Sequence, residues 1–256
     1  MLLKADIRQA GYGDQVVLQD IRFDLPEGRI LAVIGPNGCG KTTLIRALSA
    51  VLPDIQGSLH VNGTDILVAE PQARARLIAV VPQSTQIPPA FTVEEMVLMG
   101  RSPHLDWLGR ASSMDIEVAV EAMQQCDILD FRTRLCGELS AGERQRVILA
   151  RALAQATPVL LMDEPTAHLD LRYQIEFLEL TASLASRHGK TILVALHDLN
   201  LAARFGDVVM AMKSGNMAAM DTAQEILTPE LLSSIYGLPV QVFPSPDGRR
   251  TVVIPS

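Results

Sequence analysis

Long hydrophobic runs are absent from this sequence of 256 residues, in which the longest uninterrupted apolar stretches, such as 30–34 and 192–196, are five residues long. A membrane-spanning helix needs about 20 apolar residues, so the sequence predicts no such helix. The first residues also lack the apolar stretch of a secretory signal peptide. We therefore expect a cytosolic chain that does not cross a membrane.

Cysteine and positive charge are also scarce. The three cysteines, Cys39, Cys126 and Cys136, suit a reducing compartment better than a disulfide scaffold. Lys and Arg number 22 against 29 Asp and Glu, and this net charge of −7 disfavours a broad nucleic-acid-binding surface. With 48% hydrophobic and 20% charged residues, the composition is typical of a globular protein.

Short apolar segments that alternate with longer helix-like segments predict an α/β fold. The candidate strands are 30–34, 78–81, 159–162, 192–195 and 208–212. Strands that are apolar throughout are typical of a parallel sheet covered by helices on both faces. The looser alternation in 2–24 predicts an antiparallel β edge, and 240–243 and 251–254 flank a Pro-Ser-Pro-Asp-Gly turn and predict a β-hairpin.

The strand pattern disappears between Pro82 and Leu139. Thr92 and Glu95 have the spacing of a capping box, and 114–129 has the composition and apolar spacing of a helix. We therefore expect a helical subdomain at 84–155, inserted into a nucleotide-binding core made of 1–83 and 156–220. Residues 221–256 would form a small C-terminal extension that contains the hairpin.

Residues 35–42 read Gly-Pro-Asn-Gly-Cys-Gly-Lys-Thr and match the phosphate-loop pattern G-x-x-x-x-G-K-[ST] between a candidate strand and a helical segment. The backbone N–H groups of such a loop converge on phosphate oxygens at a helix N-terminus. Lys41 is expected to reach the β- and γ-phosphates, Thr42 to hold Mg²⁺ and Thr43 to bind the α-phosphate. The predicted nucleotide-binding residues of this segment are Gly35, Pro36, Asn37, Gly38, Cys39, Gly40, Lys41, Thr42 and Thr43. Cys39 is interpreted as a small residue at a tolerant position rather than as a redox switch.

Two carboxylates, Asp163 and Glu164, follow the apolar segment 159–162. At the carboxyl end of a strand beside a phosphate loop, Asp163 can join the Mg²⁺ shell, and Glu164 can polarise the attacking water as a general base. The same pair also occurs in plain loops, but the phosphate loop upstream favours the catalytic interpretation.

Residues 139–143, Leu-Ser-Ala-Gly-Glu, open another helical segment. With these motifs the chain resembles the ATPase subunits of ATP-binding cassette (ABC) transporters, which have a phosphate-loop, RecA-like α/β core and a helical insertion. The family's signature segment reads Leu-Ser-Gly-Gly-Gln, so Ala141 and Glu143 depart from it, and their effect on ATP turnover stays open. The resemblance implies that Ser140 and Gly142 bind the γ-phosphate.

The resemblance also assigns four isolated residues. Tyr12 matches the aromatic residue that stacks on adenine, and Gln83 matches the glutamine that contacts Mg²⁺ and the attacking water. Asp170, in Ala167-His168-Leu169-Asp170, matches the aspartate that contacts the partner subunit's nucleotide site, and His197 matches the histidine that contacts the γ-phosphate. Each of them alone would be an ordinary turn residue, surface amide, helix cap or structural histidine.

In this family ATP is buried between two subunits, so the resemblance implies a homodimer with two sites that use ATP and Mg²⁺. It also implies two further partners: a separate integral-membrane permease dimer and, indirectly, a substrate-binding protein. No nucleic-acid partner is expected, and the chain would be located at the cytoplasmic face of the inner membrane.

The segment 100–104, Gly-Arg-Ser-Pro-His, resembles the ATPases of importers for ferric siderophores, haem, cobalamin and molybdate-type oxyanions. The alternative interpretation is a helix end at Pro103 with solvated Arg101 and His104. Two other functions stay open: a soluble cassette ATPase that acts on nucleic acid or ribosomes, and the ATPase half of an exporter. The first usually has two cassettes in one chain or a long coiled-coil insertion, and the importer-like segment disfavours the second. The transported solute and the permease are not specified.

Overall fold

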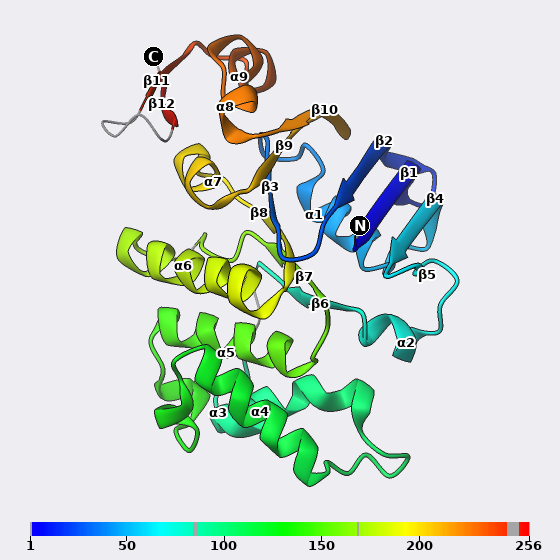
Figure 1. Ribbon diagram of the computed structural model, residues 1–256, viewed down its shortest axis with the longest axis vertical. Coiled ribbons are helices and arrows are strands. Elements are labelled where there is room, and N and C mark those ends of the chain that lie inside the picture. The colour runs from blue at the N-terminus through cyan, green and yellow to red at the C-terminus, as the bar shows by residue number, and fades with distance from the viewer. Residues whose placement is uncertain (1, 84–86, 168, 245–250, 256) are drawn as a thin grey trace.

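The computed structural model describes residues 2–83, 87–167, 169–244 and 251–255. Ten strands form one sheet in the order β5-β4-β1-β2-β10-β9-β3-β8-β7-β6, and β11 and β12 form a separate two-stranded sheet (Figure 1). The strands are β1 (Leu3–Tyr12), β2 (Gln15–Leu25), β3 (Ile30–Ile34), β4 (Asp54–Val61), β5 (Thr64–Asp65), β6 (Ile78–Val81), β7 (Val159–Asp163), β8 (Thr191–Ala195), β9 (Val208–Lys213), β10 (Asn216–Asp221), β11 (Val240–Pro244) and β12 (Thr251–Pro255). The α-helices are α1 (Lys41–Leu48), α2 (Pro71–Ala75), α3 (Val93–Leu98), α4 (Ser113–Gln125), α5 (Ala141–Ala154), α6 (Leu171–His188), α7 (Leu199–Phe205), α8 (Ala223–Ile226) and α9 (Pro229–Tyr236), and the 3₁₀ helices are η1 (Met99–His104), η2 (Leu129–Phe131) and η3 (Cys136–Glu138).

The parallel part of the sheet consists of β6, β7, β8, β3 and β9, and it agrees with the five strands predicted from apolar segments. Every residue of β3, β7 and β8 is buried, because helices cover both faces. On β3, Ile30 and Ala32 face the side of α5, α6 and α7, whereas Leu31 and Val33 face the side of α1. The α/β fold class predicted from the sequence is confirmed.

The antiparallel edge consists of β1 paired with β2 and β4, with β5 outermost. Residues 2–24 therefore form the predicted antiparallel strands. The sequence analysis missed β4, β5 and β10. Of these, β10 pairs with β9 and has one bridge to β2, so it joins the antiparallel edge to the parallel strands.

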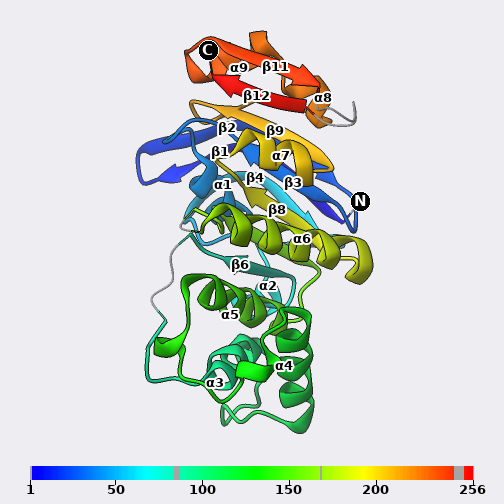
Figure 2. The same cartoon turned by 90° about the vertical axis from the view of Figure 1, so that its left-hand side faces the viewer.

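Helices α3, α4 and α5 pack on one another at one end of the molecule, and α8, α9 and the β11–β12 pair lie at the other end (Figures 1 and 2). Thr92 caps α3 through the expected capping box with Glu95. The helix expected over 114–129 ends at Gln125, since Asp127 adopts a left-handed φ of 54°. β11 and β12 occupy the segments expected to form a hairpin, while the predicted turn, at 245–250, lies outside the described residues.

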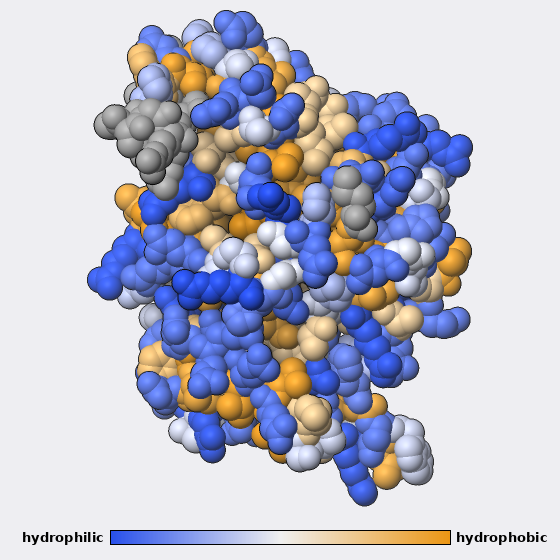
Figure 3. All heavy atoms as spheres, viewed as in Figure 1, coloured by the Kyte–Doolittle hydropathy of each residue, from blue (hydrophilic) through white to orange (hydrophobic). Residues whose placement is uncertain are grey.

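The face shown in Figure 3 carries scattered hydrophobic residues among many hydrophilic ones. Within the part of the chain that the structure describes, we found no helix with the length and apolar character needed to cross a bilayer.

The Gly-Arg-Ser-Pro-His segment forms η1 and is part of the packing between α3, α4 and α5. Arg101 is buried, and its guanidinium donates to Asp115 Oδ1 at 2.9 Å and to the Ala154 carbonyl at 2.7 Å. Gly100 has no room for a side chain, because a Cβ there would lie 2.0 Å from the Arg151 carbonyl oxygen. His104 is half-buried, with Nε2 2.9 Å from the Gln155 carbonyl oxygen.

The interpretation of Arg101 and His104 as solvated residues is therefore wrong. The same segment reaches α2, since Gln72 and Arg76 both donate to the Pro103 carbonyl. It thus joins the helical end of the molecule to the sheet side.

Replacing Arg101 by methionine is expected to lower the free energy of unfolding by about 3 kcal/mol, because it leaves the buried Asp115 carboxylate without its cation. Urea unfolding of Arg101→Met measures this loss, with the exposed Arg110→Met as the matched control. A loss no larger than that of the control would show that the ion pair contributes little.

The Asp115 carboxylate also accepts hydrogen bonds from the Ser112 hydroxyl and backbone N–H. These bonds, ahead of the contribution of Arg101, lower the pKa of Asp115 to about 2 from an ordinary value of 3.8. Because the folded-state pKa is depressed, the resulting stabilisation is complete above about pH 4 and is lost as the pH falls towards 2.

Candidate functional site

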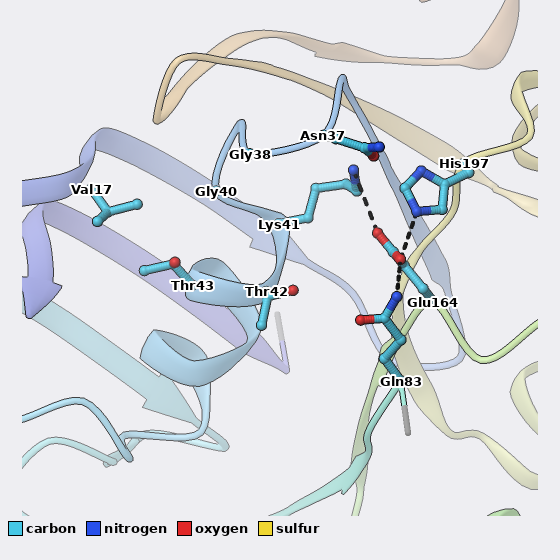
Figure 4. A pocket seen from close by; sticks show the side chains of 10 residues that line it. All are labelled: Val17, Asn37, Gly38, Gly40, Lys41, Thr42, Thr43, Gln83, Glu164 and His197. Atoms are coloured by element: carbon cyan, nitrogen blue, oxygen red, sulfur yellow. Dashed lines mark hydrogen bonds and ion pairs between the residues drawn. The ribbon is translucent and has the colours of Figure 1, made fainter. Parts of the chain in front are cut away.

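The loop 35–40 leaves the buried end of β3 and enters α1 at Lys41, so the strand and the helix hold it from both sides. It borders a cavity of about 360 Å³. The lining residues come from five parts of the chain and are Val17, Asn37, Gly38, Gly40, Lys41, Thr42, Thr43, Gln83, Glu164 and His197 (Figure 4). Gly40 caps α1 with a φ of 108°, and a Cβ there would approach Leu18 Cδ2 to 2.9 Å, so the turn requires glycine.

Lys41 is buried under this loop with its ammonium group directed into the cavity (Figure 4). Its Nζ donates to the Gly35 carbonyl at 2.9 Å and to the Pro36 carbonyl at 3.4 Å. It also lies 3.6 Å from Glu164 Oε1, in an ion pair whose side chains are 4% and 9% exposed. The positive charge is therefore fixed at the loop by neighbours from three positions of the chain.

Glu164 lies at the centre of the polar side chains in the cavity (Figure 4). Gln83 Nε2 donates to Glu164 Oε2 at 2.6 Å, and His197 Nε2 lies 2.6 Å from the same oxygen. The backbone of Glu164 has a φ of 48°, a left-handed conformation that is costly for a residue with a side chain. The buried end of β7 and these contacts hold the carboxylate in this position.

Asp163, the last residue of β7, is buried beside the first turn of α1, and its Oδ1 accepts a hydrogen bond from Thr42 Oγ1 at 3.2 Å. Burial raises the pKa of Asp163, while the Thr42 hydrogen bond opposes this shift. Mg²⁺ prefers one or two carboxylates together with phosphate and other oxygen ligands. The hydroxyl and carboxylate oxygens of Thr42 and Asp163 fit this donor set.

Tyr12 lies at the end of β1 and is not among the described residues that line the cavity. Arg46, one turn beyond Thr42 on α1, donates to the Tyr12 hydroxyl at 2.9 Å, and its guanidinium carbon lies 5.9 Å from the ring centroid. The sequence analysis missed Arg46, although a residue four positions after Thr42 lies on the same face of a helix.

Cys39 is buried within the loop, and burial raises the pKa of its thiol. A thiol with a raised pKa is a poor nucleophile at neutral pH. This agrees with the interpretation of Cys39 as a small residue of the loop.

Ser140, Gly142 and Asp170 form a second group where α5 and α6 begin, in which Ser140 and Asp170 are exposed and Gly142 is buried. Ser140 and Asp170 are the N-caps of these helices: Ser140 exchanges hydrogen bonds with Glu143, and Asp170 accepts from the Tyr173 N–H at 3.1 Å. A Cβ on Gly142 would lie 3.0 Å from Tyr173 Cδ1, so the Tyr173 ring covers this glycine.

Glu143 completes a capping box with Ser140. Glutamine, the family residue at this position, can form the same capping box, so the substitution preserves the start of α5. The described residues that line the phosphate-loop cavity do not include Ser140, Gly142 or Asp170. His168, in the same segment as Asp170, lies outside the described residues.

A strand, phosphate loop and helix, with a carboxylate pair at the end of β7, which β8 separates from β3, define a nucleotide-binding protein of the phosphate-loop class. Comparison with known proteins identifies the family: the ABC transporter family profile matches residues 18–167, and the chain belongs to this family.

Its relatives include the iron(3+)-hydroxamate import ATP-binding protein FhuC of Bacillus subtilis, which is 37% identical over 95% of this chain and 91% of that protein. The hemin import ATP-binding protein HmuV of Streptomyces coelicolor is 43% identical over 95% of this chain and 86% of that protein. The resemblance to ABC ATP-binding subunits, and to the siderophore and haem importer group, is thereby confirmed.

Among solved structures, an ABC transporter of the metal-chelate type in an inward-facing conformation superimposes with a TM-score of 0.86, at 31% identity, over 100% of this chain and 97% of that chain. A dimeric bacterial ABC transporter cassette superimposes with a TM-score of 0.72, at 25% identity, over 87% of this chain and 99% of that chain. Cassettes of this fold thus form dimers.

Proposed function

We propose that this protein is the ATP-hydrolysing, energy-coupling subunit of an importer for a metal chelate or a related solute such as a siderophore, haem or cobalamin. The observation that carries the ATPase part is the buried Glu164 carboxylate, in contact with Lys41, Gln83 and His197 at the edge of the phosphate loop. The similarity to iron-hydroxamate and hemin import subunits supports the solute class.

In this proposal the loop N–H groups and Lys41 bind the phosphates of ATP. The Lys41 ammonium is already desolvated and held at the loop, so little ordering is needed when a phosphate arrives. Glu164 orients the attacking water and accepts its proton as general base. Thr43, buried in the first turn of α1, would bind the α-phosphate.

Thr42, Asp163 and Gln83 would hold Mg²⁺, which neutralises charge on the β- and γ-phosphates when it is bound. Thr42 and Asp163 are already in contact, and the raised pKa of Asp163 reflects a buried carboxylate that a cation would favour. Arg46 would position the exposed Tyr12 ring for stacking on adenine.

Two copies of the chain would complete each site. Ser140, Gly142 and Asp170 lie together but apart from their own chain's phosphate loop, as expected for groups that contact ATP across a two-fold interface. In this arrangement 84–155 acts as the signature subdomain, 1–83 with 156–220 as the nucleotide-binding core, and 221–256 as an extension.

Transport would require an integral-membrane permease dimer, which this chain would bind at the cytoplasmic face of the inner membrane, and a substrate-binding protein on the other side. ATP binding would close the two copies and hydrolysis would release them, so the differential affinity of ATP for the closed state moves the permease.

Replacing His197 by alanine is expected to reduce ATP turnover about 100-fold, within the range for loss of one electrostatic contact to a transition state. Since 45% of the His197 side chain is exposed, the fold should survive. Steady-state ATP turnover checks this prediction, with a thermal melt as the folding control. Normal turnover would show that His197 does not take part in hydrolysis. An unfolded variant would show that its role is structural.

The transport function is tested by deleting the gene and measuring uptake of radiolabelled ferric siderophore, hemin and cobalamin, with complementation by the wild type and by Glu164→Gln. The proposal requires that uptake of one solute is lost and that only the wild type restores it. Unchanged uptake with loss of efflux would indicate an exporter, and RNA bound to the purified chain would indicate a nucleic-acid ATPase.

A further inference from the structure

The C-terminal extension contacts the segment that carries His197. His197 is the second residue after β8, and Asp198 caps α7 by accepting from the N–H groups of Asn200, at 2.7 Å, and Leu201, at 3.1 Å. His197 is therefore separated from the first turn of α7 by a single residue whose side chain is anchored in that turn. We therefore expect a displacement of this turn to move His197 as well.

The first turn of α7 is in turn tied to β12. The Asn200 side chain donates through Nδ2 to the Val253 carbonyl at 3.3 Å and accepts from the Val253 N–H at 2.8 Å. One amide thus pairs with both backbone groups of a residue 53 positions away, as a neighbouring strand would. Val253 itself is buried against the same core as Leu201.

Close packing is incomplete around this contact. A cavity of about 310 Å³ lies between the segment 197–200 and the C-terminal extension. It is lined by His197, Asp198, Leu199, Asn200, Tyr236, Leu238, Val240 and Val253. His197 therefore borders this cavity on one side and the phosphate-loop cavity on the other. Atoms that border a cavity lack packing partners on that side, so packing alone constrains residues 197–200 weakly. The two hydrogen bonds of Asn200 therefore contribute most to fixing their position.

Tyr236 brings the same extension to the phosphate loop. Its hydroxyl is buried, and burial, with a further contribution from Cys39, raises the pKa of Tyr236 to about 12 while the Gly35 backbone opposes the shift. The extension thus lies next to the start of the loop as well as to the His197 segment.

From these contacts we propose that Asn200 is a positioning residue for ATP hydrolysis: it anchors α7 to β12 and thereby sets His197 relative to Glu164. Asn200 itself does not touch the nucleotide. The inference rests on the proposed role of His197. It gives β12 of the C-terminal extension a part in turnover rather than in ATP binding.

The test is a double-mutant cycle with the full-length chain, in which single-turnover hydrolysis of radiolabelled ATP measures even slow rates. Asn200→Ala is expected to lower the rate about tenfold with the ATP affinity unchanged within about twofold, because small misplacements of catalytic groups are costly. Asn200→Asp retains the acceptor of the 2.8 Å hydrogen bond but loses the donor to the Val253 carbonyl, so it should recover only part of the rate. In the His197→Ala background, Asn200→Ala should have no further effect.

Thr228→Ala is the matched control, because it removes a side-chain hydrogen bond at the N-cap of α9, in the same extension, and leaves the Asn200–Val253 hydrogen bonds in place. Its rate should equal that of the wild type. The positioning role is overturned if Asn200→Ala turns over normally, if Thr228→Ala is equally slow, or if the Asn200 effect persists in His197→Ala. Failure of His197→Ala alone to slow hydrolysis is a separate result, which contradicts the proposed function of the site.

Discussion

Glu164→Gln is expected to lower ATP turnover by about 10²–10⁴-fold, the range that general-base catalysis contributes, while the affinity for ATP stays within a few-fold of the wild type. Glutamine has nearly the shape of glutamate, so the left-handed backbone at this position and the Gln83 contact at 2.6 Å can persist. What disappears is a carboxylate that can accept a proton from water. Steady-state phosphate release and binding of a fluorescent ATP analogue measure the two quantities.

The matched control for this variant is Glu179→Gln. Glu179 is a half-exposed residue of α6 whose carboxylate pairs with Arg204 on α7, away from the phosphate-loop cavity. It should turn over normally. If Glu164→Gln retained near-normal turnover, another group would have to be the base, and the assignment of the carboxylate pair would fail.

Lys41→Ala is expected to weaken ATP binding by about 10- to 150-fold, as follows from the 1.5–3 kcal/mol of a hydrogen bond to a charged group. The ammonium is almost fully buried and held by the Gly35 carbonyl, so water replaces it poorly. Its removal also leaves Glu164 with one charged neighbour fewer, and a thermal melt must accompany the binding titration.

Lys190→Ala provides a matched control for Lys41→Ala. Lys190 is half-buried, and its ammonium donates to the Thr157 carbonyl at 2.7 Å, just before β7 and β8 begin. Its replacement should leave the ATP affinity unchanged. Equal affinities for Lys41→Ala and the wild type would contradict the phosphate-binding role of the loop lysine.

The parts of the site that are contiguous in sequence could be predicted from it. The loop 35–42 and the pair Asp163 and Glu164 follow apolar strands directly, so local order places them at the carboxyl end of a parallel sheet. The helix caps Thr92, Ser140 and Asp170 are likewise local, since each side chain bonds a backbone N–H three residues on. For these residues the neighbouring sequence is sufficient to predict their position.

Contacts between distant segments could not be predicted from the residues alone. Gln83 reaches Glu164 across 81 positions, and Arg46 reaches Tyr12 across 34, so their pairing depends on the strand order of the whole sheet. Only family resemblance singled out Gln83 and Tyr12 beforehand, and Arg46 was missed. The alternative interpretation of Arg101 as a solvated residue failed because burial of an arginine depends on a partner, here Asp115, which sequence polarity does not reveal.

The strands β4, β5 and β10 were missed for a related reason. The residues of β4 and β10 are mostly half-buried or exposed, so they lack the apolar pattern that marked the parallel strands. They are held by pairing with β1 and β9, which is a property of the assembled sheet.

The central claim, that two copies of this chain enclose ATP and that hydrolysis at Glu164 releases them, is tested most directly by the mass of Glu164→Gln in solution. Sedimentation velocity compares this variant without nucleotide and with saturating ATP and Mg²⁺. The account predicts a chain of 27.8 kDa without nucleotide and twice that mass with it, and reversal of dimerisation when Ser140→Arg is added. A variant that binds ATP and stays monomeric would contradict the account.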